Sequence, residues 1–160
     1  MAGFAKIGSI EGQSTDKNHD KWINVDSVSS PVSRSITDGA KDQERTRGTT
    51  TLHDIVLTRP LDKSSVKLAE ACAKGTFFDK VEIHLSTQVK EQEEPYLKYV
   101  LENVIITSYN FSGTAAGNPQ PMESITLNFT KIEWTYVTID PKTGDKKGQV
   151  AANYDLGKRG

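Results

Sequence analysis

The sequence has one cysteine and three histidines among 160 residues, and it has no long apolar run. A single thiol, Cys72, excludes an internal disulfide. The histidines, His19, His53 and His84, have no spacing typical of a metal site. No segment reaches the roughly 20 apolar residues of a membrane helix, and the first residues lack the apolar core of a signal peptide. We therefore expect no metal, no cofactor, no membrane insertion and no cleaved signal.

An excess of charge of one sign is also absent. Twenty basic and 21 acidic residues are interspersed and give a net charge of −1. A nucleic-acid-binding surface needs a concentrated basic face, so we expect no nucleic-acid partner. The hydrophobic fraction is 35% and the mean hydropathy is −0.54, which indicates a lean core in a single domain, residues 1–160. A net charge near zero gives little repulsion between copies and suits a protein that associates.

No group of residues has the pattern of a catalytic site. None of the serines lies in a nucleophile elbow. His84 alternates with Ile83 and Leu85, so its side chain is predicted to face solvent. The carboxylates within residues 91–94 are interpreted as a solvated turn rather than a catalytic pair. The sequence therefore predicts a protein that is not an enzyme. A hydrolase would require one histidine substitution to abolish a measured turnover.

Short runs with a period of two, separated by turn residues, dominate the chain. We expect strands at 4–10, 22–28, 49–58, 81–86, 96–101, 103–111, 125–130, 132–136 and 150–154. The turn at 140–145 has proline and glycine in favoured places. Many short strands with one helix indicate an all-β barrel or sandwich that carries a helical patch.

The best helical segment covers residues 61–75. Asp62 is expected to cap its N-terminus, and Leu61 with Val66 occupies the two positions of a hydrophobic staple. Gly75 supplies the left-handed residue that ends a helix. The stripe expected to face the sheet contains Leu68, Ala69 and Cys72. On this stripe Cys72 is interpreted as an inert buried thiol, because reactive thiols need a polar and accessible setting.

Residues 37–48 form the longest stretch without large apolar side chains, and they are rich in charge. A connection of this length within a compact domain is usually functional or disordered.

Seven stretches in chain order together resemble the hemolysin-coregulated protein (Hcp) family, the tube subunits of the bacterial type VI secretion system. They are GQSTDKNH (12–19), DQERTRG (42–48), LDKSSVKL (61–68) with ACAKG (71–75), YLKY (96–99) with NVIITSY (103–109), and ITLNFTKIEWTY (125–136). Each stretch alone is weak, but the ordered set is specific and covers nearly the whole chain.

The resemblance implies a two-sheet β-barrel with one short α-helix packed on its side. It also implies homohexameric rings that stack into a tube and hold effector proteins in the lumen. The implied partners are other copies of the chain and the sheath, spike and baseplate proteins. The implied location is the bacterial cytoplasm during assembly, followed by secretion to the medium or a target cell. Such a protein would be structural, with any toxicity supplied by its cargo.

Two sets of residues follow from the resemblance by position. The extended loop of the family reaches the adjacent ring, which assigns ring stacking to Lys41, Asp42, Glu44, Arg45 and Arg47. A serine that faces the lumen in some members matches Ser29, although Val28 and Ser30 replace the aromatic residues that often flank it. Ser29 as an ordinary strand-edge residue is an equal alternative.

The alternative function is a monomeric β-barrel module that binds a small ligand or a glycan. Such a module requires a concave cluster of exposed aromatic side chains, and the candidates are Trp22, Tyr109, Trp134 and Tyr136. Trp134 and Tyr136 alternate with polar residues, which favours a place in the core for both.

Overall fold

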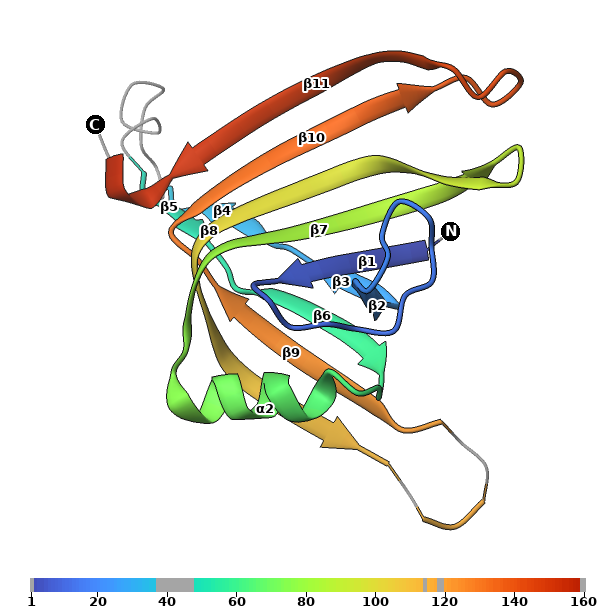
Figure 1. Ribbon diagram of the computed structural model, residues 1–160. Coiled ribbons are helices and arrows are strands. Elements are labelled where there is room, and N and C mark those ends of the chain that lie inside the picture. Colours follow the sequence, from blue (N-terminus) through green and yellow to red (C-terminus); the bar gives the residue numbers. More distant parts are fainter. Residues whose placement is uncertain (1, 37–47, 114, 118–119, 159–160) are drawn as a thin grey trace.

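The computed structural model describes residues 2–36, 48–113, 115–117 and 120–158 (Figure 1). Strands dominate these residues, and the helical parts are one α-helix and one short 3-10 turn. In chain order the elements are β1 (Ala2–Ile7), β2 (Ile23–Val25), β3 (Ser27–Ser29), β4 (Val32–Arg34), β5 (Thr50–Leu52), β6 (Ile55–Pro60), α2 (Ser65–Lys74), β7 (Phe77–Val89), β8 (Gln92–Ser112), β9 (Met122–Asn128), β10 (Lys131–Ile139), β11 (Lys146–Asp155) and η1 (Leu156–Lys158). Neither helical element is long and apolar enough to cross a bilayer.

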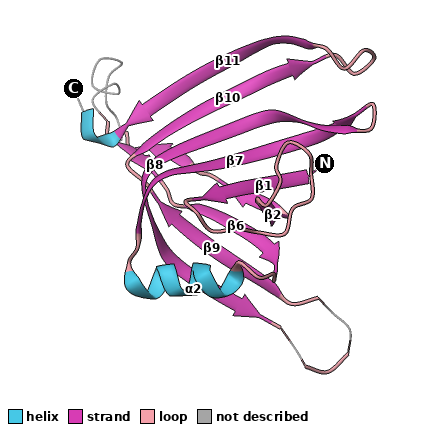
Figure 2. Cartoon of the chain, viewed as in Figure 1, coloured by secondary structure: helices cyan, strands magenta, loops and turns pink. Residues whose placement is uncertain are grey.

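The strands form one large antiparallel sheet and one small one (Figure 2). The main path of the large sheet runs β2-β1-β7-β8-β9-β6-β3, and β10 adds to β8 and carries β11 at its other edge. The small sheet pairs β4 with β5. The expected mostly-β architecture of two sheets with one short helix is therefore confirmed.

The two ends of the large sheet meet at a bent segment, residues 23–29. Its first half, β2, pairs with β1, and its second half, β3, pairs with β6. At the bend the Asp26 N–H donates to the Thr58 carbonyl oxygen over 2.9 Å. The path nevertheless ends at β2 and β3, so the sheet curls around a core without closing into a continuous barrel.

Strand β8 connects the two halves of the sheet. Its first part pairs with β10 and its last part with β9, while β7 follows it along residues 92–105. The strand bends at Asn103, which has a φ of 55° and donates from Nδ2 to Thr130 Oγ1 over 2.9 Å. Asparagine tolerates this left-handed conformation better than most residues. The two separate strands predicted at 96–101 and 103–111 are therefore wrong, because one bent strand spans both.

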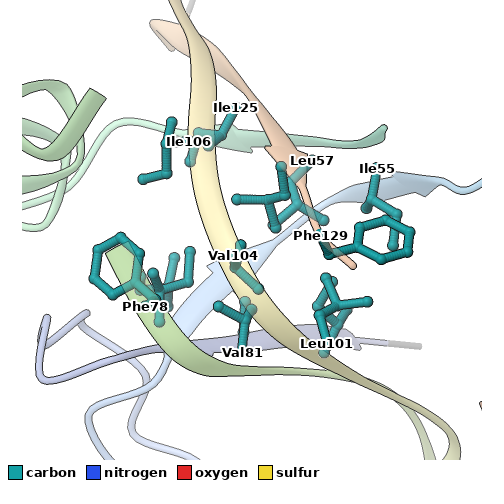
Figure 3. Close-up of a cluster of buried hydrophobic side chains, with 14 of the residues drawn as sticks. Ile55, Leu57, Phe78, Val81, Leu101, Val104, Ile106, Ile125 and Phe129 are labelled. Atoms are coloured by element: carbon teal, nitrogen blue, oxygen red, sulfur yellow. The ribbon is translucent and has the colours of Figure 1, made fainter. Parts of the chain in front are cut away.

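The core lies on the inner face of the curled sheet, where apolar side chains from facing strands interlock (Figure 3). Ile55 and Leu57 of β6 lie opposite Leu127 and Ile125 of β9, and all four are fully buried. The complete cluster comprises Ala5, Ile7, Ile23, Val25, Ile55, Leu57, Leu68, Ala71, Phe78, Val81, Ile83, Leu101, Val104, Ile106, Ile125, Leu127, Phe129 and Ile132. Burial of this apolar surface is the main source of the fold's stability.

Helix α2 packs against β8 through Leu68, which is fully buried, and Ala71. It begins at Ser65, later than the sequence suggested, and Asp62 Oδ1 accepts the Ser64 N–H over 2.7 Å in the turn before it. The predicted staple is wrong, because Val66 is 74% exposed. The predicted end is confirmed, since Gly75 has a φ of 62° and its N–H faces the last carbonyls of the helix. Ala69 and Cys72 are only half-buried.

Candidate assembly surface

The inner face of the sheet continues beyond the core along β10. Residues directly opposite each other in an antiparallel ladder point to the same face. Buried Ile132 lies opposite Leu101, and two and four residues further along, Trp134 and Tyr136 lie opposite Tyr99 and Leu97. Exposure rises along this row, from zero at Ile132 to 50% at Tyr136. The apolar pattern therefore extends past the region that the chain itself can cover.

Strand β11 continues this face to the edge of the sheet. Val150 lies opposite Tyr136 and is 73% exposed. We call the partly exposed continuation of the inner face the flared face, defined by the half-buried Leu97, Tyr99 and Trp134 and the exposed Tyr136 and Val150. Figure 1 shows β10 and β11 at the end of the molecule opposite α2, where β10 lies beside β8 and β11 forms the edge. A small pocket of about 100 Å³ opens beside it, lined by Val28, Ser30, Ile83, Leu85, Leu97 and Tyr99.

The outer edge of β11 has no neighbouring strand in the described part of the chain. Nine of the ten residues of β11, all except Lys147, pair with β10 on one side, and no described strand pairs with the other side. An edge strand of this length presents unpaired backbone N–H and C=O groups and invites pairing with another chain. The first residues of the strand, Lys146 and Lys147, place charge at one end of the edge. The uncharged centre, with Val150, remains available for contact.

The tip of the β7–β8 hairpin contacts the tip of the β10–β11 hairpin beside the flared face. Gly144, with a φ of 79°, turns the β10–β11 connection directly against Val89, where an added Cβ would lie 2.5 Å from the valine Cγ1. Lys146 Nζ lies 3.8 Å from Glu94 Oε2 across the same junction. The Asp140 carboxylate accepts the Lys142 N–H over 2.8 Å and stabilises the turn. These contacts therefore hold the β10–β11 hairpin against the β7–β8 hairpin.

A second group of exposed apolar side chains lies at the other end of the molecule. Val66 on α2, Phe77 at the start of β7 and Phe111 near the end of β8 are each more than half exposed. In Figure 1, α2 and the end of β8 lie at the end of the molecule away from β11, whereas β7 and the first part of β8 run alongside β10. Exposed apolar side chains thus occur at more than one place on the molecule, and head-to-tail contact between identical subunits joins two different patches.

The stem of the predicted stacking loop is described, but its charged residues are not. Lys41, Asp42, Glu44, Arg45 and Arg47 lie outside the described residues. In the stem, the Ser35 N–H donates to the Thr49 carbonyl oxygen over 2.9 Å, and the Thr49 N–H donates to Ser35 Oγ over 3.0 Å. Gly48 passes so close to Ser35 that any side chain would clash with its carbonyl oxygen. The small β4–β5 sheet therefore holds the two ends of the loop together.

The predicted lumen residue Ser29 lies in β3. Its side chain is exposed and its backbone pairs with Val56 of β6. Val28, the neighbour that stands where the family often has an aromatic residue, is half-buried against the core. This geometry is compatible with either interpretation of Ser29, as a lumen residue or as an ordinary residue at a strand edge.

The prediction of a solvated His84 is wrong. His84 Nδ1 lies 2.9 Å from Nε2 of His19, a side chain that is 1% exposed, and the Trp22 ring packs against both imidazoles. Burial is the largest cause that lowers the pKa of His84 to about 4, and the charges of His19 and Lys98 lower it further. His53 is exposed and contacts Ser33. Among the described residues, no group of three side chains is arranged to hold a metal ion.

A buried polar cluster beneath α2 was missed in the sequence. The Arg59 guanidinium pairs with the Glu123 carboxylate through Nη1, and its Nη2 lies 2.6 Å from Asp62 Oδ2. The Tyr109 hydroxyl donates to Glu123 Oε2 over 2.5 Å. Burial, together with the hydrogen bond and charge of Glu123, raises the pKa of Tyr109 to about 12. The sequence did contain a sign of this cluster. Arg59 and Glu123 occupy inward positions in the alternating patterns of two strands that pair with each other.

The aromatic candidates do not form one cluster. Trp134 is half-buried beside the core, whereas Tyr136 is half-exposed on the flared face, so the expected core position of Tyr136 is wrong. Trp22 packs against the histidine pair, and Tyr109 joins the buried polar cluster. The concave aromatic site that a ligand-binding module requires is not assembled from these four residues.

The curled sheet and its one α-helix define a mostly-β protein, and large apolar side chains remain exposed on β10 and β11. Residues 4–136 match the family described as "Type VI secretion system effector, Hcp". The chain is 29% identical over 133 residues to protein hcp1 of Pseudomonas aeruginosa, a match that covers 83% of this chain and 81% of that protein. The chain belongs to the Hcp family, and the resemblance found in the sequence is confirmed.

Solved structures agree with this assignment. A structure described as a type six secretion system protein superposes with a TM-score of 0.88 at 28% identity, covering 97% of this chain and 95% of that one. A type VI secretion system effector from Yersinia pestis superposes with a TM-score of 0.73 at 29% identity, covering 96% and 98%. The chain is therefore a type VI secretion protein, of a family of secreted tube proteins rather than of enzymes.

Proposed function

We propose that this chain forms six-membered rings that stack into the tube of a type VI secretion system and carry effector proteins in the lumen. The observation that carries the proposal is the flared face, an apolar sheet surface that continues from the core and is left uncovered by its own chain. Tyr136 and Val150 are large side chains at its exposed end. Contact with a second copy would remove this surface from water and stabilise the assembly.

The arrangement of surfaces favours a closed ring over a two-fold dimer. A two-fold dimer places the same patch of both subunits in contact, whereas a ring joins two different patches. The flared face lies at one end of the molecule, and α2, which carries the exposed Val66, lies at the other end. Closing the ring would also cover the edge of β11, which otherwise invites open-ended pairing.

The remaining parts of the proposal rest on the family. We assign ring stacking to the charged loop with Arg45 and Arg47, and contact with cargo in the lumen to Ser29. Exposed ion pairs contribute only about 0–1 kcal/mol each, but their repetition around a ring multiplies the effect. The proposed partners are other copies, the sheath, spike and baseplate proteins, and the effectors, with assembly in the bacterial cytoplasm before secretion. No catalytic role is proposed.

A pair of substitutions on β11 tests the lateral contact. Val150→Lys places a charge on the flared face, and Asn153→Lys places the same charge on the same strand at a position that points to the opposite face. Both residues are exposed, so neither change should disturb the isolated fold. We expect the parent chain and Asn153→Lys to form six-subunit particles by analytical ultracentrifugation and closed circles by electron microscopy. Val150→Lys should remain monomeric with an unchanged circular dichroism spectrum.

Two results would overturn the proposal. A parent chain that stays monomeric at high concentration would contradict self-assembly altogether. Closed rings of unchanged stability in Val150→Lys would leave self-assembly standing but exclude the flared face as the contact.

A further inference from the structure

A chain of polar contacts links the loop after β1 to the outer face of β7. His19 Nδ1 lies 2.6 Å from Asp16 Oδ2, and His19 Nε2 lies 2.9 Å from His84 Nδ1. The His19 ring stacks on Phe4 with centroids 4.3 Å apart, and the Trp22 ring lies 4.8 Å from each imidazole. Two histidines are therefore in direct hydrogen-bond contact inside a shielded aromatic cage.

The contact limits how many protons the pair can hold. Where two imidazole nitrogens meet, one donates and the other accepts. With neutral rings, His19 donates from Nδ1 to Asp16 and accepts at Nε2 from the His84 Nδ1–H. With one added proton, His19 donates from both nitrogens and His84 accepts at Nδ1. A second added proton would set N–H against N–H at 2.9 Å, and the bond would be lost.

The surroundings of His84 oppose that second proton. Lys98 lies opposite His84 on β8, and Phe4 lies opposite it on β1. Burial, the His19 charge and the Lys98 charge hold the pKa of His84 at about 4, while Glu82 on the same strand acts in the other direction. The positive charges of Lys80 and Lys6 lie near Glu82, lower its pKa, and partly balance its negative charge. The charged groups around the ring, apart from Asp16 and Glu82, are therefore cations that favour its neutral form.

The contact between His19 and His84 attaches residues 12–22 to the sheet. Other residues of the same segment contact the start of α2 and the start of β8. Within the segment, the Gly12 N–H donates to the Lys21 carbonyl oxygen over 2.8 Å. On one side, Gln13 Oε1 accepts the Lys63 N–H over 3.1 Å, next to the start of α2. On the other side, Asn18 Nδ2 donates to the Glu93 carbonyl oxygen over 2.9 Å, at the start of β8. Both of these outer contacts are exposed and neutral, so the hydrogen bond of the partly buried histidine pair is the stronger attachment.

We propose that the His19–His84 pair is a proton-operated latch that holds residues 12–22 on the sheet and releases them when both rings become protonated. The latch is closed at neutral pH, where His84 is neutral and the hydrogen bond between the two rings is intact. It opens as the pH approaches 4, because the second proton enters His84 and removes the hydrogen bond. We expect the curled sheet behind it to stay folded, since its apolar core cluster contains neither histidine. This property goes beyond ring formation and does not depend on it.

Hydrogen–deuterium exchange of the full chain tests the latch. Exchange rates corrected for the intrinsic effect of pH should show that peptides within residues 12–22 lose protection at least tenfold between pH 7 and pH 4. Peptides from β7 and β8 should keep theirs. His84→Gln supplies an amide that can bond to His19 but cannot take a proton, so the loss of protection should disappear. His53→Gln, an exposed histidine away from the pair, is the matched control and should retain it.

Nitrogen-15 NMR of the imidazoles answers the same question without a substitution. His84 should remain neutral until the pH nears 4 and should then titrate together with the amide shifts of residues 12–22. The proposal fails if the segment stays protected at pH 4 in the parent chain or loses protection equally in His84→Gln. It also fails if the β7 and β8 peptides lose protection at the same pH, because that result would mean global acid unfolding.

Discussion

Glu123→Gln removes one charge from the buried polar cluster while keeping the size of the side chain. Glu123 is 1% exposed, and its carboxylate has two partners, the Arg59 guanidinium and the Tyr109 hydroxyl. Arg59 is also fully buried, so the substitution leaves a guanidinium without its main counter-charge. Asp62, 2.6 Å from Arg59 Nη2, and the Asn24 carbonyl oxygen, 2.9 Å from Arg59 Nε, remain in place.

The expected cost follows from these contacts. Removing one partner of a buried ion pair typically costs about 3–5 kcal/mol, because the other charge stays buried and unpaired. The remaining contact with Asp62 reduces this cost, and we expect the free energy of unfolding to fall by about 2–4 kcal/mol. In a chain of this length each kcal/mol lowers the melting temperature by about 2–4 °C, so the shift should be about 5–15 °C. The pKa of Tyr109 should also fall from about 12, because Glu123 contributes to raising it.

Urea unfolding followed by circular dichroism measures the effect. The Val150→Lys chain is the suitable parent, because ring formation would otherwise add to the apparent stability. Arg59→Met, alone and combined with Glu123→Gln, completes a double-mutant cycle, and the double variant should be more stable than the sum of the single losses predicts. A Glu123→Gln chain within about 0.5 kcal/mol of its parent, together with additive losses, would refute the assignment of a strongly coupled buried pair.

Three further predictions concern the helix, the charged loop and the histidine pair. Leu68→Asp should lower the free energy of unfolding by about 3–5 kcal/mol, because it buries an unpaired charge beneath α2; an unchanged thermal melt would contradict this. Arg45→Glu combined with Arg47→Glu should leave single rings intact but weaken tube formation in electron micrographs, whereas loss of the ring itself would place the loop at the lateral contact. The folded chain holds the pKa of His84 at about 4, below its ordinary 6.5, so the unfolded chain binds more protons between these values. Stability should therefore be complete above about pH 6.5 and decline toward pH 4, by about 1–2 kcal/mol once the partial exposure of the ring is discounted, and urea midpoints of His84→Gln should lack this part of the decline.

The local elements could be predicted where one periodicity and one turn signal agreed. Strands β7 and β9 follow the alternation of apolar and polar residues, and Gly75 ends the helix as expected. The errors came where a strand bends instead of stopping. At Asn103 a left-handed residue interrupts the alternation of β8 without ending its pairing, because β7 continues beside it. The alternation of apolar and polar residues cannot by itself distinguish a bend from a turn. Both interrupt the alternation by one residue, so that the next inward-facing position is shifted.

The histidine pair could not be predicted from spacing, because 65 residues separate His19 from His84 and the contact exists only once β1 lies beside β7. The alternation of apolar and polar residues in β7 correctly placed His84 on the outer face of the sheet. It also implied that the side chain there would face solvent. The loop of residues 12–22 covers that part of the face, and no local sequence pattern predicts that a distant loop will pack there. By contrast, Arg59 and Glu123 stood at inward positions of their strands and were detectable, since two opposite charges at core positions require each other as partners.

The residues that stabilise the fold and those proposed to assemble it form separate sets along the same strands. On β10, Ile132 is fully buried and belongs to the core, whereas Tyr136, four residues further, lies on the flared face and is half-exposed. Because exposed positions contribute little to the isolated fold, substitutions at Tyr136 or Val150 should change the oligomeric state with little change in monomer stability. Substitutions at Ile132 should do the reverse and reduce stability first, with assembly lost only as a consequence. The proposed rings would then form and dissociate without unfolding of the subunit, because the apolar surface that would join the copies is a continuation of the core and not a part of it.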